Sequence, residues 1–349
     1  MWKIAHRRYR LPFRSVVRTA HGAWAEREGF LLRIEASAGA SEPVVGWGEA
    51  APLDWFGTET LDAAAAALEE LHGEARDLAD ALARVPTACV SLRAALAAAW
   101  AEAEPEAREE AVKFLPLAGL LPAGRAVRAA VAAKLELGYR TFKWKVGATD
   151  DADERALLDD LLGDLPSGAR LRLDANGAWD RRTAERWLAL AAERPQIEYL
   201  EQPIAPETRG AEDLLRGLAE DYPVKIALDE SITGARDIER WLAADWRGVW
   251  VLKPALLGEP GPVLARLAKA GADVVFGSAL ETAVGARAGL KLAFAWAETR
   301  PAAERRALGY GVWPLFAERR ADWPTEGGSF IRREELARVD AEALWNALN

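Results

Sequence analysis

Hydrophobic and polar residues follow different patterns in different parts of the chain. Up to about residue 50, apolar and β-branched residues form strand-like stretches such as FLLRIEASAG and VVGWGEAAPL. Turn-forming residues lie between these stretches. Residues 60–110 are rich in alanine, and their apolar positions recur with the period of a helix. Strands followed by helices predict a small α+β domain over residues 1–110.

From residue 111 to residue 315, short apolar stretches alternate with charged, amphipathic ones. Repeated strand–helix units are typical of an α/β protein with a parallel sheet, and eight of them predict a barrel that closes on itself. A doubly wound open sheet is the alternative, but no glycine-rich phosphate-binding turn follows the first strand. The eight predicted strands are VKFLPLAG, TFKWKVG, RLRLDANG, IEYLEQP, VKIALDES, GVWVLKP, DVVFGSALE and, with a weaker pattern, ALGYGVW.

Residues 316–349 differ from both parts. They are polar, are interrupted by DWPTEGGS and contain no strand–helix unit. We expect this segment to fold back onto the small domain.

Composition narrows the possible partners and the location. The 349 residues carry a formal net charge of −9, which disfavours binding to nucleic acid or to an anionic membrane. The N-terminus lacks the apolar core of a signal peptide, and no apolar run reaches the roughly 18–20 residues of a membrane span. We therefore expect a cytoplasmic protein. Its single cysteine, Cys89, cannot form an internal disulfide and is expected to be buried.

Charged residues end five consecutive predicted barrel strands. A barrel carries its chemistry at the C-terminal ends of its strands, so these charges are predicted to surround one mouth. The separations between Lys145, the three acids and Lys253 are 29, 27, 28 and 24 residues, each about one strand–helix unit. The residues are Lys143, Lys145, Asp174, Glu201, Asp229 and Lys253.

Each of these residues alone has a simpler interpretation. A single Asp before a helix is usually an N-cap, and a single Lys is usually solvated. The joint pattern, with acids in the middle and lysines on either side, favours a site.

Three carboxylates at one mouth would repel one another unless a cation lies among them. Carboxylate oxygens suit Mg²⁺, and Mn²⁺ is possible because it accepts similar ligands. Zinc is not expected, because the three histidines, His6, His21 and His72, all precede the barrel.

Such a site suits removal of a proton next to a carboxylate. The metal would withdraw charge from the substrate carboxylate, and a lysine would remove the proton on the adjacent carbon. Lys145, nearer the strand's C-terminal end, is the predicted base, and Lys143 is a neighbouring cation that helps keep it unprotonated. Lys253 approaches from the other side. It either acts on the opposite face of the substrate or stabilises the charge of the intermediate.

The motifs KWK, DAN, EQP, DES and LKP together resemble the enolase superfamily, and within it the muconate-lactonizing-enzyme-like subgroup. The resemblance extends over nearly the whole chain and includes GWGEAAPL in the first domain. It implies a (β/α)7β, TIM-like barrel with an N-terminal α+β capping domain. A lysine base used together with Mg²⁺ is an established pattern of this superfamily.

The resemblance also implies a role for each matching residue. Asp174, Glu201 and Asp229 would hold Mg²⁺, and Lys145 and Lys253 would be the paired catalytic lysines. Lys143, Asn176 and Glu230 lie in the same motifs and would support them.

The subgroup contains synthases, racemases, epimerases and cycloisomerases. Its dipeptide epimerases carry an Asp-x-Asp element at the eighth strand, whereas ALGYGVWPLF has no acid. LKPALLG, FGSALETAVG and the N-terminal LPFRSVVRTAHGAWAEREGFLLRIE resemble the o-succinylbenzoate synthases of the subgroup. That resemblance implies dehydration of a cyclohexadiene carboxylate in menaquinone synthesis.

Two alternatives stay open at this point. A racemase of N-acylamino acids or a dipeptide epimerase would use the same two lysines. A non-catalytic binding barrel would lack the base or a metal ligand, and neither is missing.

Four further residues are candidate contacts for a small-molecule carboxylate substrate. Ser278 and Ala279, in the turn GSALET, are predicted to hold a second carboxylate, although Ser278 is equally suited to cap a helix. Arg172 shares a face with Asp174 and either contacts substrate or balances charge. Trp24, like the neighbouring loop at 55–56, either covers the site or packs within the cap. The sequence leaves a homo-oligomer possible.

Overall fold

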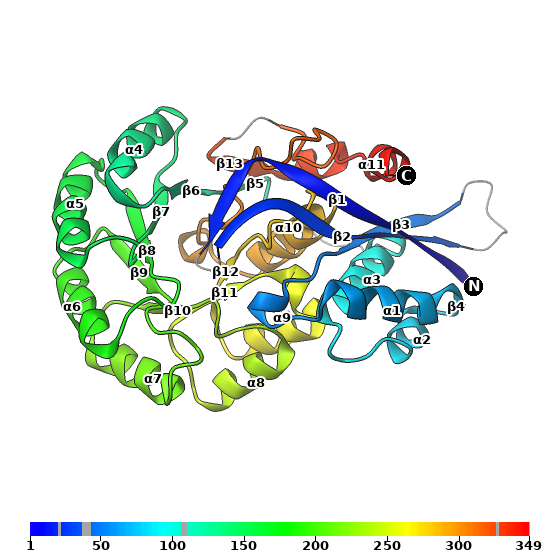
Figure 1. Ribbon diagram of the computed structural model, residues 1–349, viewed down its shortest axis with the longest axis horizontal. Helices are drawn as coiled ribbons and strands as arrows, with labels where there is room; N and C mark the ends of the chain where they lie inside the picture. The colour runs from blue at the N-terminus through cyan, green and yellow to red at the C-terminus, as the bar shows by residue number, and fades with distance from the viewer. Residues whose placement is uncertain (20–21, 37–42, 106–109, 326–327, 349) are drawn as a thin grey trace.

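The structure, a computed structural model, describes residues 1–19, 22–36, 43–105, 110–325 and 328–348. His21 lies outside these residues. Figure 1 shows an arc of helices, α4 to α8, around a set of short strands, and beside it a long antiparallel sheet with α1, α2 and α3. The chain therefore consists of a barrel and an N-terminal α+β cap that lie against each other.

The cap is built on a four-stranded antiparallel sheet with the order β3-β2-β1-β4. Three helices pack on it, and their buried apolar residues form one cluster with the sheet. Cys89 lies in this cluster and is 4% exposed, as expected. The elements are β1 (Trp2–Thr19), β2 (Gly22–Ala36), β3 (Val45–Ala50), the 3₁₀ helix η1 (Asp54–Phe56), α1 (Leu61–Leu71), β4 (Gly73–Ala75), α2 (Leu78–Ala83) and α3 (Val90–Ala103).

Two glycines in the motif GWGEA allow α3 to pack directly on β3. A Cβ atom at Gly46 would lie 2.0 Å from the carbonyl oxygen of Ala99, and one at Gly48 would lie 2.0 Å from that of Ala95. Both distances are far inside van der Waals contact, so any side chain at either position would push the helix away.

The barrel contains seven parallel strands in sequential order, each followed by a helix. Apolar residues on the outer side of the strands pack against the helices, and a smaller cluster that includes Tyr199 and Val251 fills the interior. The strands are β6 (Ala118–Leu121), β7 (Thr141–Lys145), β8 (Arg170–Asp174), β9 (Ile197–Glu201), β10 (Ile226–Leu228), β11 (Val249–Leu252) and β12 (Asp273–Phe276). The helices are α4 (Val127–Glu136), α5 (Asp151–Asp164), α6 (Arg181–Ala192), α7 (Ala211–Asp221), α8 (Ala235–Ala243), α9 (Pro260–Lys269) and α10 (Ala283–Glu298).

The segment that follows α10 closes the barrel. Leu308 pairs in parallel with Leu117, next to β6, and Gly309 pairs in parallel with Gly277, next to β12. Among the described residues the eighth strand consists of these isolated bridges, which agrees with its weak pattern in the sequence. The closure confirms the predicted capped (β/α)7β barrel and rules out the doubly wound open sheet.

The predicted first barrel strand, VKFLPLAG, is divided between two sheets. Its first part forms β5 (Phe114–Pro116), which pairs antiparallel with β13 (Phe330–Arg332) outside the barrel, and only β6 enters the barrel. The single strand expected over 112–119 is therefore wrong. The sequence pattern shows that the residues are extended, but it does not show which partner strand they meet.

The C-terminal segment contains β13, the 3₁₀ helix η5 (Arg333–Arg338) and α11 (Ala341–Ala347). The guanidinium of Arg7 on β1 donates to the carbonyl oxygens of Trp345 and Leu348. The rings of Trp47 on β3 and Trp345 meet edge to face, with centroids 5.5 Å apart. Figure 1 shows α11 beside the sheet of the cap.

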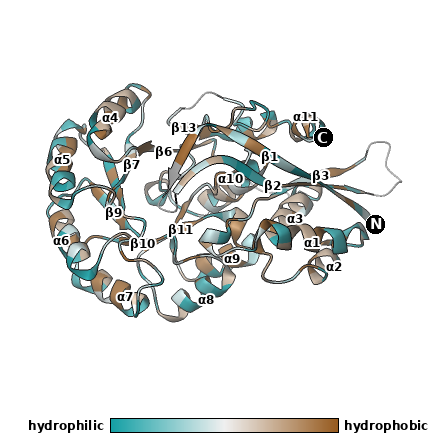
Figure 2. Cartoon of the chain, viewed as in Figure 1, coloured by the Kyte–Doolittle hydropathy of each residue, from teal (hydrophilic) through white to brown (hydrophobic). Residues whose placement is uncertain are grey.

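The hydropathy of the residues follows the arrangement of strands inside and helices outside. Figure 2 shows hydrophobic residues along the barrel strands and mixed colouring, with hydrophilic turns, on the helices around them. Within the described ranges, no helix is long and apolar enough to cross a membrane.

Candidate active site

The lysines of TFKWKVG share one face of β7. Phe142 and Trp144 alternate with them and are fully buried between the barrel and its helices. Lys143 and Lys145 therefore point to the opposite side of the strand, into the barrel mouth. This arrangement explains how two ammonium groups are placed in an apolar strand.

A cavity of about 150 Å³ lies at the C-terminal ends of the strands. The barrel forms its floor and side, and the cap contributes residues of η1 and the residue before it. The cavity is lined by Leu53, Trp55, Phe56, Lys143, Lys145, Asp174, Asn176, Asp229, Glu230, Lys253, Ser278, Ala279 and Leu280. Most of the predicted site residues are thus together, while Glu201 lies beneath the lining and is fully buried.

Lys143 is surrounded by carboxylates. Its Nζ lies 2.9 Å from Asp174 Oδ2 and 2.6 Å from Glu201 Oε1. Burial alone would lower the pKa of Lys143, but Asp174 and Glu201 outweigh it and hold that pKa well above the usual range. Lys143 is therefore a fixed positive charge in this arrangement.

The acids at this mouth are in excess over the cations that pair with them. Burial and then the neighbouring Asp174 raise the pKa of Glu201 well above its usual range, and its Oε2 has no hydrogen-bond partner. Lys253 pairs with Asp229, and although burial opposes it, that pairing lowers the pKa of Asp229. A buried carboxylate that still favours a proton indicates that the cluster can accept additional positive charge.

Lys145 differs from the other two lysines. Its Nζ has no hydrogen bond or ion pair to any residue in the described part of the chain, and it lines the cavity. The ammonium or amine of Lys145 is thus the nitrogen most available to a molecule in the cavity.

Asn176 and Glu230 form a second polar pair at the mouth. Asn176 Nδ2 donates to Glu230 Oε1 at 3.0 Å, and the backbone N–H of Asn176 donates to Asp174 Oδ1 at 3.1 Å. Asn176 adopts a left-handed φ of 45°, which asparagine tolerates better than most residues. Burial and the nearby Asp229 raise the pKa of Glu230 to about 7. Asn176 thereby connects the ends of β8 and β10.

The three predicted metal ligands fit a hard divalent cation by their chemistry and surroundings. As the side chains stand, no group of three or more His, Cys, Asp or Glu residues in the described ranges is arranged to hold an ion. Lys143 lies between Asp174 and Glu201, and Lys253 pairs with Asp229. The unpartnered buried Oε2 of Glu201 and the all-carboxylate donors suit Mg²⁺. Lysine side chains are long and flexible enough to withdraw from the acids.

Gln202 is a site residue that the sequence did not single out. It is fully buried and has a left-handed φ of 38°. Its Oε1 accepts from the backbone N–H groups of Asp229 and Ser231, at 2.9 and 3.1 Å, and its Nε2 donates to Ser231 Oγ at 2.7 Å. Gln202 therefore fixes the turn that carries Asp229, and its place beside Glu201 in EQP was the available signal.

The turn Ser278–Leu280 lines the cavity but is already bonded within the chain. Glu281 Oε2 accepts from Ser278 Oγ at 2.9 Å and from the backbone N–H of Ala279 at 2.5 Å, and Ser278 Oγ accepts from the N–H of Leu280 at 2.9 Å. The N-cap of α10 is Thr282 rather than Ser278. The buried Glu281, which the sequence did not indicate, therefore shapes this wall.

The cap reaches the cavity through η1. The ring centroid of Phe56 lies 4.2 Å from Lys253 Nζ, and Trp55 meets Trp24 edge to face at 5.5 Å. Trp24 does not line the cavity itself, and its position depends on Trp55 and on the guanidinium of Arg27, 5.3 Å from its ring. The cap thus contributes aromatic rings to the wall of the site.

Arg172 lies below the cavity in the barrel interior. It is 1% exposed, and its Nε donates to Glu198 Oε2 at 2.7 Å. Its guanidinium also lies 5.0 Å from the ring centroid of Tyr199. In this position Arg172 pairs with buried charge and does not line the cavity.

The fold and this mouth define a capped barrel that gathers carboxylates and lysines at its strand ends. The family described as "Enolase C-terminal domain-like" matches residues 125–325, and "MenC, N-terminal domain" matches residues 1–99. The chain belongs to the enolase superfamily.

Individual relatives indicate which members of the superfamily this chain is similar to. The o-succinylbenzoate synthase of Thermosynechococcus vestitus is 38% identical over 316 residues, which cover 89% of this chain and 91% of that protein. A hydrophobic dipeptide epimerase of Roseobacter litoralis is 31% identical and covers 71% of this chain and 76% of its own length. The crystal structure of o-succinylbenzoate synthase from Thermosynechococcus elongatus, with Mg in its active site, superposes with a TM-score of 0.82 at 35% identity and covers 99% of this chain and all of that one.

A more distant neighbour shows the fold alone. The L-Ala-D/L-Glu epimerase of Bacillus subtilis has a TM-score of 0.78 at 22% identity and covers 95% of each chain.

Proposed function

We propose that this chain is a Mg²⁺-dependent lyase that dehydrates a succinyl-hydroxycyclohexadiene carboxylate to o-succinylbenzoate in menaquinone biosynthesis. The observation that carries the proposal is the 38% identity to an o-succinylbenzoate synthase, which extends over both cap and barrel. The substrate is a small-molecule carboxylate. The lysines and carboxylates of the mouth supply the chemistry that such a reaction needs.

Asp174, Glu201 and Asp229 are the proposed ligands of Mg²⁺, and Mn²⁺ is proposed to substitute because it accepts the same oxygen ligands. When bound, the cation withdraws charge from the substrate carboxylate and makes the adjacent C–H bond more acidic. Holding the cation would require Lys143 and Lys253 to leave the acids that they pair with here. Lys143 stays a nearby positive charge, and Asn176 and Glu230 hold the ends of β8 and β10 in register.

Lys145 is the proposed base. Its Nζ faces the cavity without a partner in the described part of the chain, so it is available to take the proton from the α-carbon. The protonated Lys145 then gives that proton to the hydroxyl group on the neighbouring carbon, which leaves as water, and the ring becomes aromatic. Lys253, across the cavity, is the proposed cation that stabilises the enediolate charge.

The succinyl carboxylate is proposed to bind near the turn Ser278–Leu280. Because the N–H of Ala279 donates to Glu281, the proposed donor is the hydroxyl of Ser278, which would rotate away from Glu281. Trp55 and Phe56 cover this side, and we propose that they exclude water from the intermediate. Trp24 supports Trp55, and Arg172 balances buried charge below.

The second candidate is a racemase or epimerase. It is favoured by the two lysines that line one cavity and by the 31% identity to a dipeptide epimerase. Against it, the segment ALGYGVWPLF has no acid to bind a substrate ammonium.

One experiment separates the two candidates. The purified protein with Mg²⁺ is assayed by absorbance for o-succinylbenzoate formation and by NMR for exchange of the α-proton of N-succinylamino acids and dipeptides in D₂O. The lyase proposal predicts that dehydration has the higher kcat/KM. Deuterium incorporation without dehydration would overturn it.

A further inference from the structure

A second, larger cavity lies at the opposite end of the barrel. Its volume is about 720 Å³, and residues that begin strands line it, including Thr141 of β7, Arg170 of β8 and Asp273 of β12. Lys145 and Asp174 end two of the same strands, so at about 3.3 Å per residue the two cavities are separated by about 13 Å of barrel. The proposed reaction uses no residue of this second cavity.

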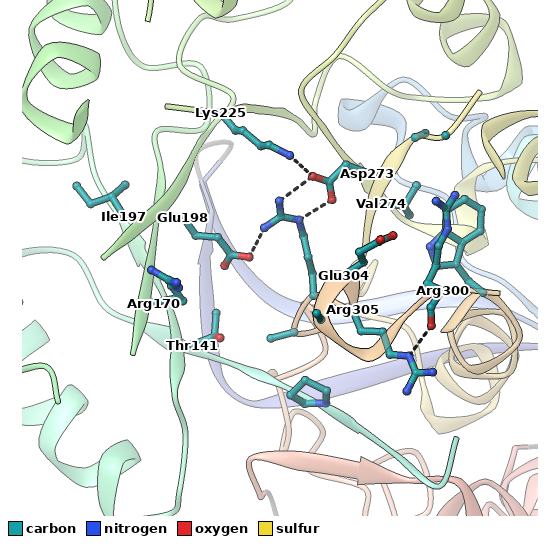
Figure 3. Close-up of a pocket in the computed structure, with 17 residues that line it drawn as sticks. Thr141, Arg170, Ile197, Glu198, Lys225, Asp273, Val274, Arg300, Glu304 and Arg305 are labelled. Carbon is teal, nitrogen blue, oxygen red and sulfur yellow. Dashed lines mark hydrogen bonds and ion pairs between the residues drawn. The ribbon is translucent and has the colours of Figure 1, made fainter. Parts of the chain in front are cut away.

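The centre of this cavity is a network of paired charges. Asp273 accepts from Lys225 at 2.6 Å and from Arg306 at 2.6 Å, and Arg306 also pairs with Glu198. Figure 3 shows the side chains of Lys225, Asp273 and Glu198 directed toward the middle of the cavity. Glu198 pairs in addition with Arg172 of the barrel interior, so three cations, with Arg306 shared, neutralise the two acids.

Three arginines around this centre have no acid partner. Arg170 Nη1 donates to the carbonyl oxygen of Pro195 at 2.7 Å, and Arg305 Nε donates to that of Ala297 at 3.0 Å. The guanidinium of Arg300 lies 4.7 Å from the ring centroid of Trp296. Within the described ranges, no carboxylate lies within ion-pair distance of any of these three guanidinium groups.

These contacts orient the three arginines. A backbone carbonyl or an aromatic face fixes each side chain while several N–H groups stay available for a ligand. Figure 3 shows Arg170 on one side of the cavity and Arg300 and Arg305 on the other. The lining thus has an excess of cations over acids, in a chain whose net charge is −9.

We propose that this cavity binds a small anionic molecule with phosphate groups at two ends. Guanidinium groups bind phosphate oxygens through paired N–H donors, and a concave, positively charged surface concentrates anions. Since the arginines lie on opposite sides, a ligand that contacts both sides carries anionic groups at both ends. Cations pair with Asp273 and Glu198, so Glu304 is the lining acid that opposes such a ligand, against five cationic side chains.

Isothermal titration with tripolyphosphate, in Mg²⁺-free buffer at low salt, tests the proposal on the full chain. We expect one saturable site. Arg170→Gln and Arg300→Gln should each weaken the Kd about tenfold, because each removes a charge-assisted contact. Inorganic phosphate, which carries a single phosphate group, should bind more weakly than tripolyphosphate.

Two control variants locate the binding. Arg128→Gln removes an exposed arginine of α4 that pairs with Asp164, and it should leave the Kd unchanged. Lys145→Ala removes a lysine of the other cavity and should also leave the Kd unchanged. Circular dichroism verifies that each variant is folded. Absence of saturable binding, an unchanged Kd in both arginine variants, or equal weakening by Arg128→Gln or Lys145→Ala would overturn the proposal.

Discussion

Phe56 of the cap lies against Lys253 of the barrel, with its ring centroid 4.2 Å from the ammonium nitrogen. The ring is 6% exposed and packs with Leu53, Leu256 and Ala279, residues from both parts of the chain. A cation over an aromatic face is stabilised by the ring quadrupole, more strongly where water is excluded. The position of Lys253 therefore depends on how the cap is seated.

Replacing Phe56 by leucine should reduce kcat more than it raises KM. Leucine keeps an apolar side chain in the cluster but removes the aromatic face, a loss of roughly 0.5–2 kcal/mol, or roughly 2- to 30-fold in kcat/KM. Steady-state kinetics with saturating Mg²⁺ measure the change. Phe56→Tyr keeps the ring and should recover most of the activity; if it is as impaired as Phe56→Leu, the ring face is not the cause.

Lys145→Ala should reduce turnover by roughly 10²- to 10⁴-fold, the usual range for loss of a general base. The fold should persist, because the ammonium of Lys145 makes no hydrogen bond or ion pair with the rest of the described chain. Activity and thermal unfolding are measured together. The matched control is Lys269→Ala, on the exposed side of α9, which should change neither. Turnover by Lys145→Ala within a few-fold of the parent would exclude it as the base.

Mg²⁺ should stabilise the protein as well as activate it. A ligand that binds only the folded state adds about 2.7 kcal/mol to the free energy of unfolding at one hundred times its Kd. EDTA should abolish activity without unfolding the chain, because Lys143 and Lys253 lie close enough to pair with Asp174 and Asp229. Differential scanning fluorimetry with increasing Mg²⁺ measures the shift in Tm.

Asp174→Ala is the variant that tests the metal site by a readout other than activity. Its Tm should no longer respond to Mg²⁺, whereas Asp213→Ala, an exposed acid on α7, should respond like the parent. An unchanged Mg²⁺ response in Asp174→Ala would show that the ion binds elsewhere.

The sequence predicted the barrel and the gathering of charges because both depend on local patterns that repeat. Lys145, Asp174 and Glu201 end consecutive strands at nearly equal spacing, and parallel strands in a barrel bring such ends to one edge. The pairing of Lys145 with Asp174, and of Asp174 with Glu201, follows that rule.

Other features depend on partners that are distant in sequence. Between β8 and β9 the register shifts so that Leu171 pairs with Ile197 and Arg172 with Tyr199, which leaves Glu198 as an extra residue. Strict alternation would place Glu198 on the opposite side from Tyr199, but the bulge turns it toward Arg172. No local pattern around Glu198 signals this shift.

Buried polar residues were not predicted either, because their partners are also distant in sequence. Glu49 of the cap accepts hydrogen bonds from Tyr9 Oη at 2.5 Å, from the N–H of Thr282 at 2.9 Å and from that of Gly285 at 3.0 Å. These donors lie at the start of α10 and on β1, so the role of Glu49 exists only once the cap is seated on the barrel. In the sequence, Glu49 and Glu281 look like ordinary surface acids.

The carboxylate of Glu281 lies among other acidic groups. Burial, and less strongly the nearby Glu49, raise the pKa of Glu281 from 4.5 to about 7. Tyr9 and Tyr310 also face it, and it accepts hydrogen bonds from Ser278 and Ala279. Because the pKa is higher in the folded state, the folded chain binds this proton more tightly than the unfolded chain.

Glu281 therefore contributes stability at low pH that is lost as the pH rises. The contribution is fully present below about pH 4.5, declines between pH 4.5 and about 7, and is gone above pH 7, an order-of-magnitude change of about 3 kcal/mol. Glu281→Gln keeps an acceptor for Ser278 and Ala279 but does not ionise. It should raise the free energy of unfolding by roughly 1–3 kcal/mol at pH 8 and change it little at pH 5.

Urea unfolding at several pH values, followed by circular dichroism, measures this difference. Glu207→Gln, an exposed glutamate between β9 and α7, is the control and should stay within about 0.5 kcal/mol of the parent at every pH. If Glu281→Gln is destabilised equally at pH 5 and pH 8, Glu281 is ionised throughout and acts as an acceptor alone. If its advantage at pH 8 appears without loss of activity, the turn Ser278–Leu280 needs an acceptor at this position and not a charge.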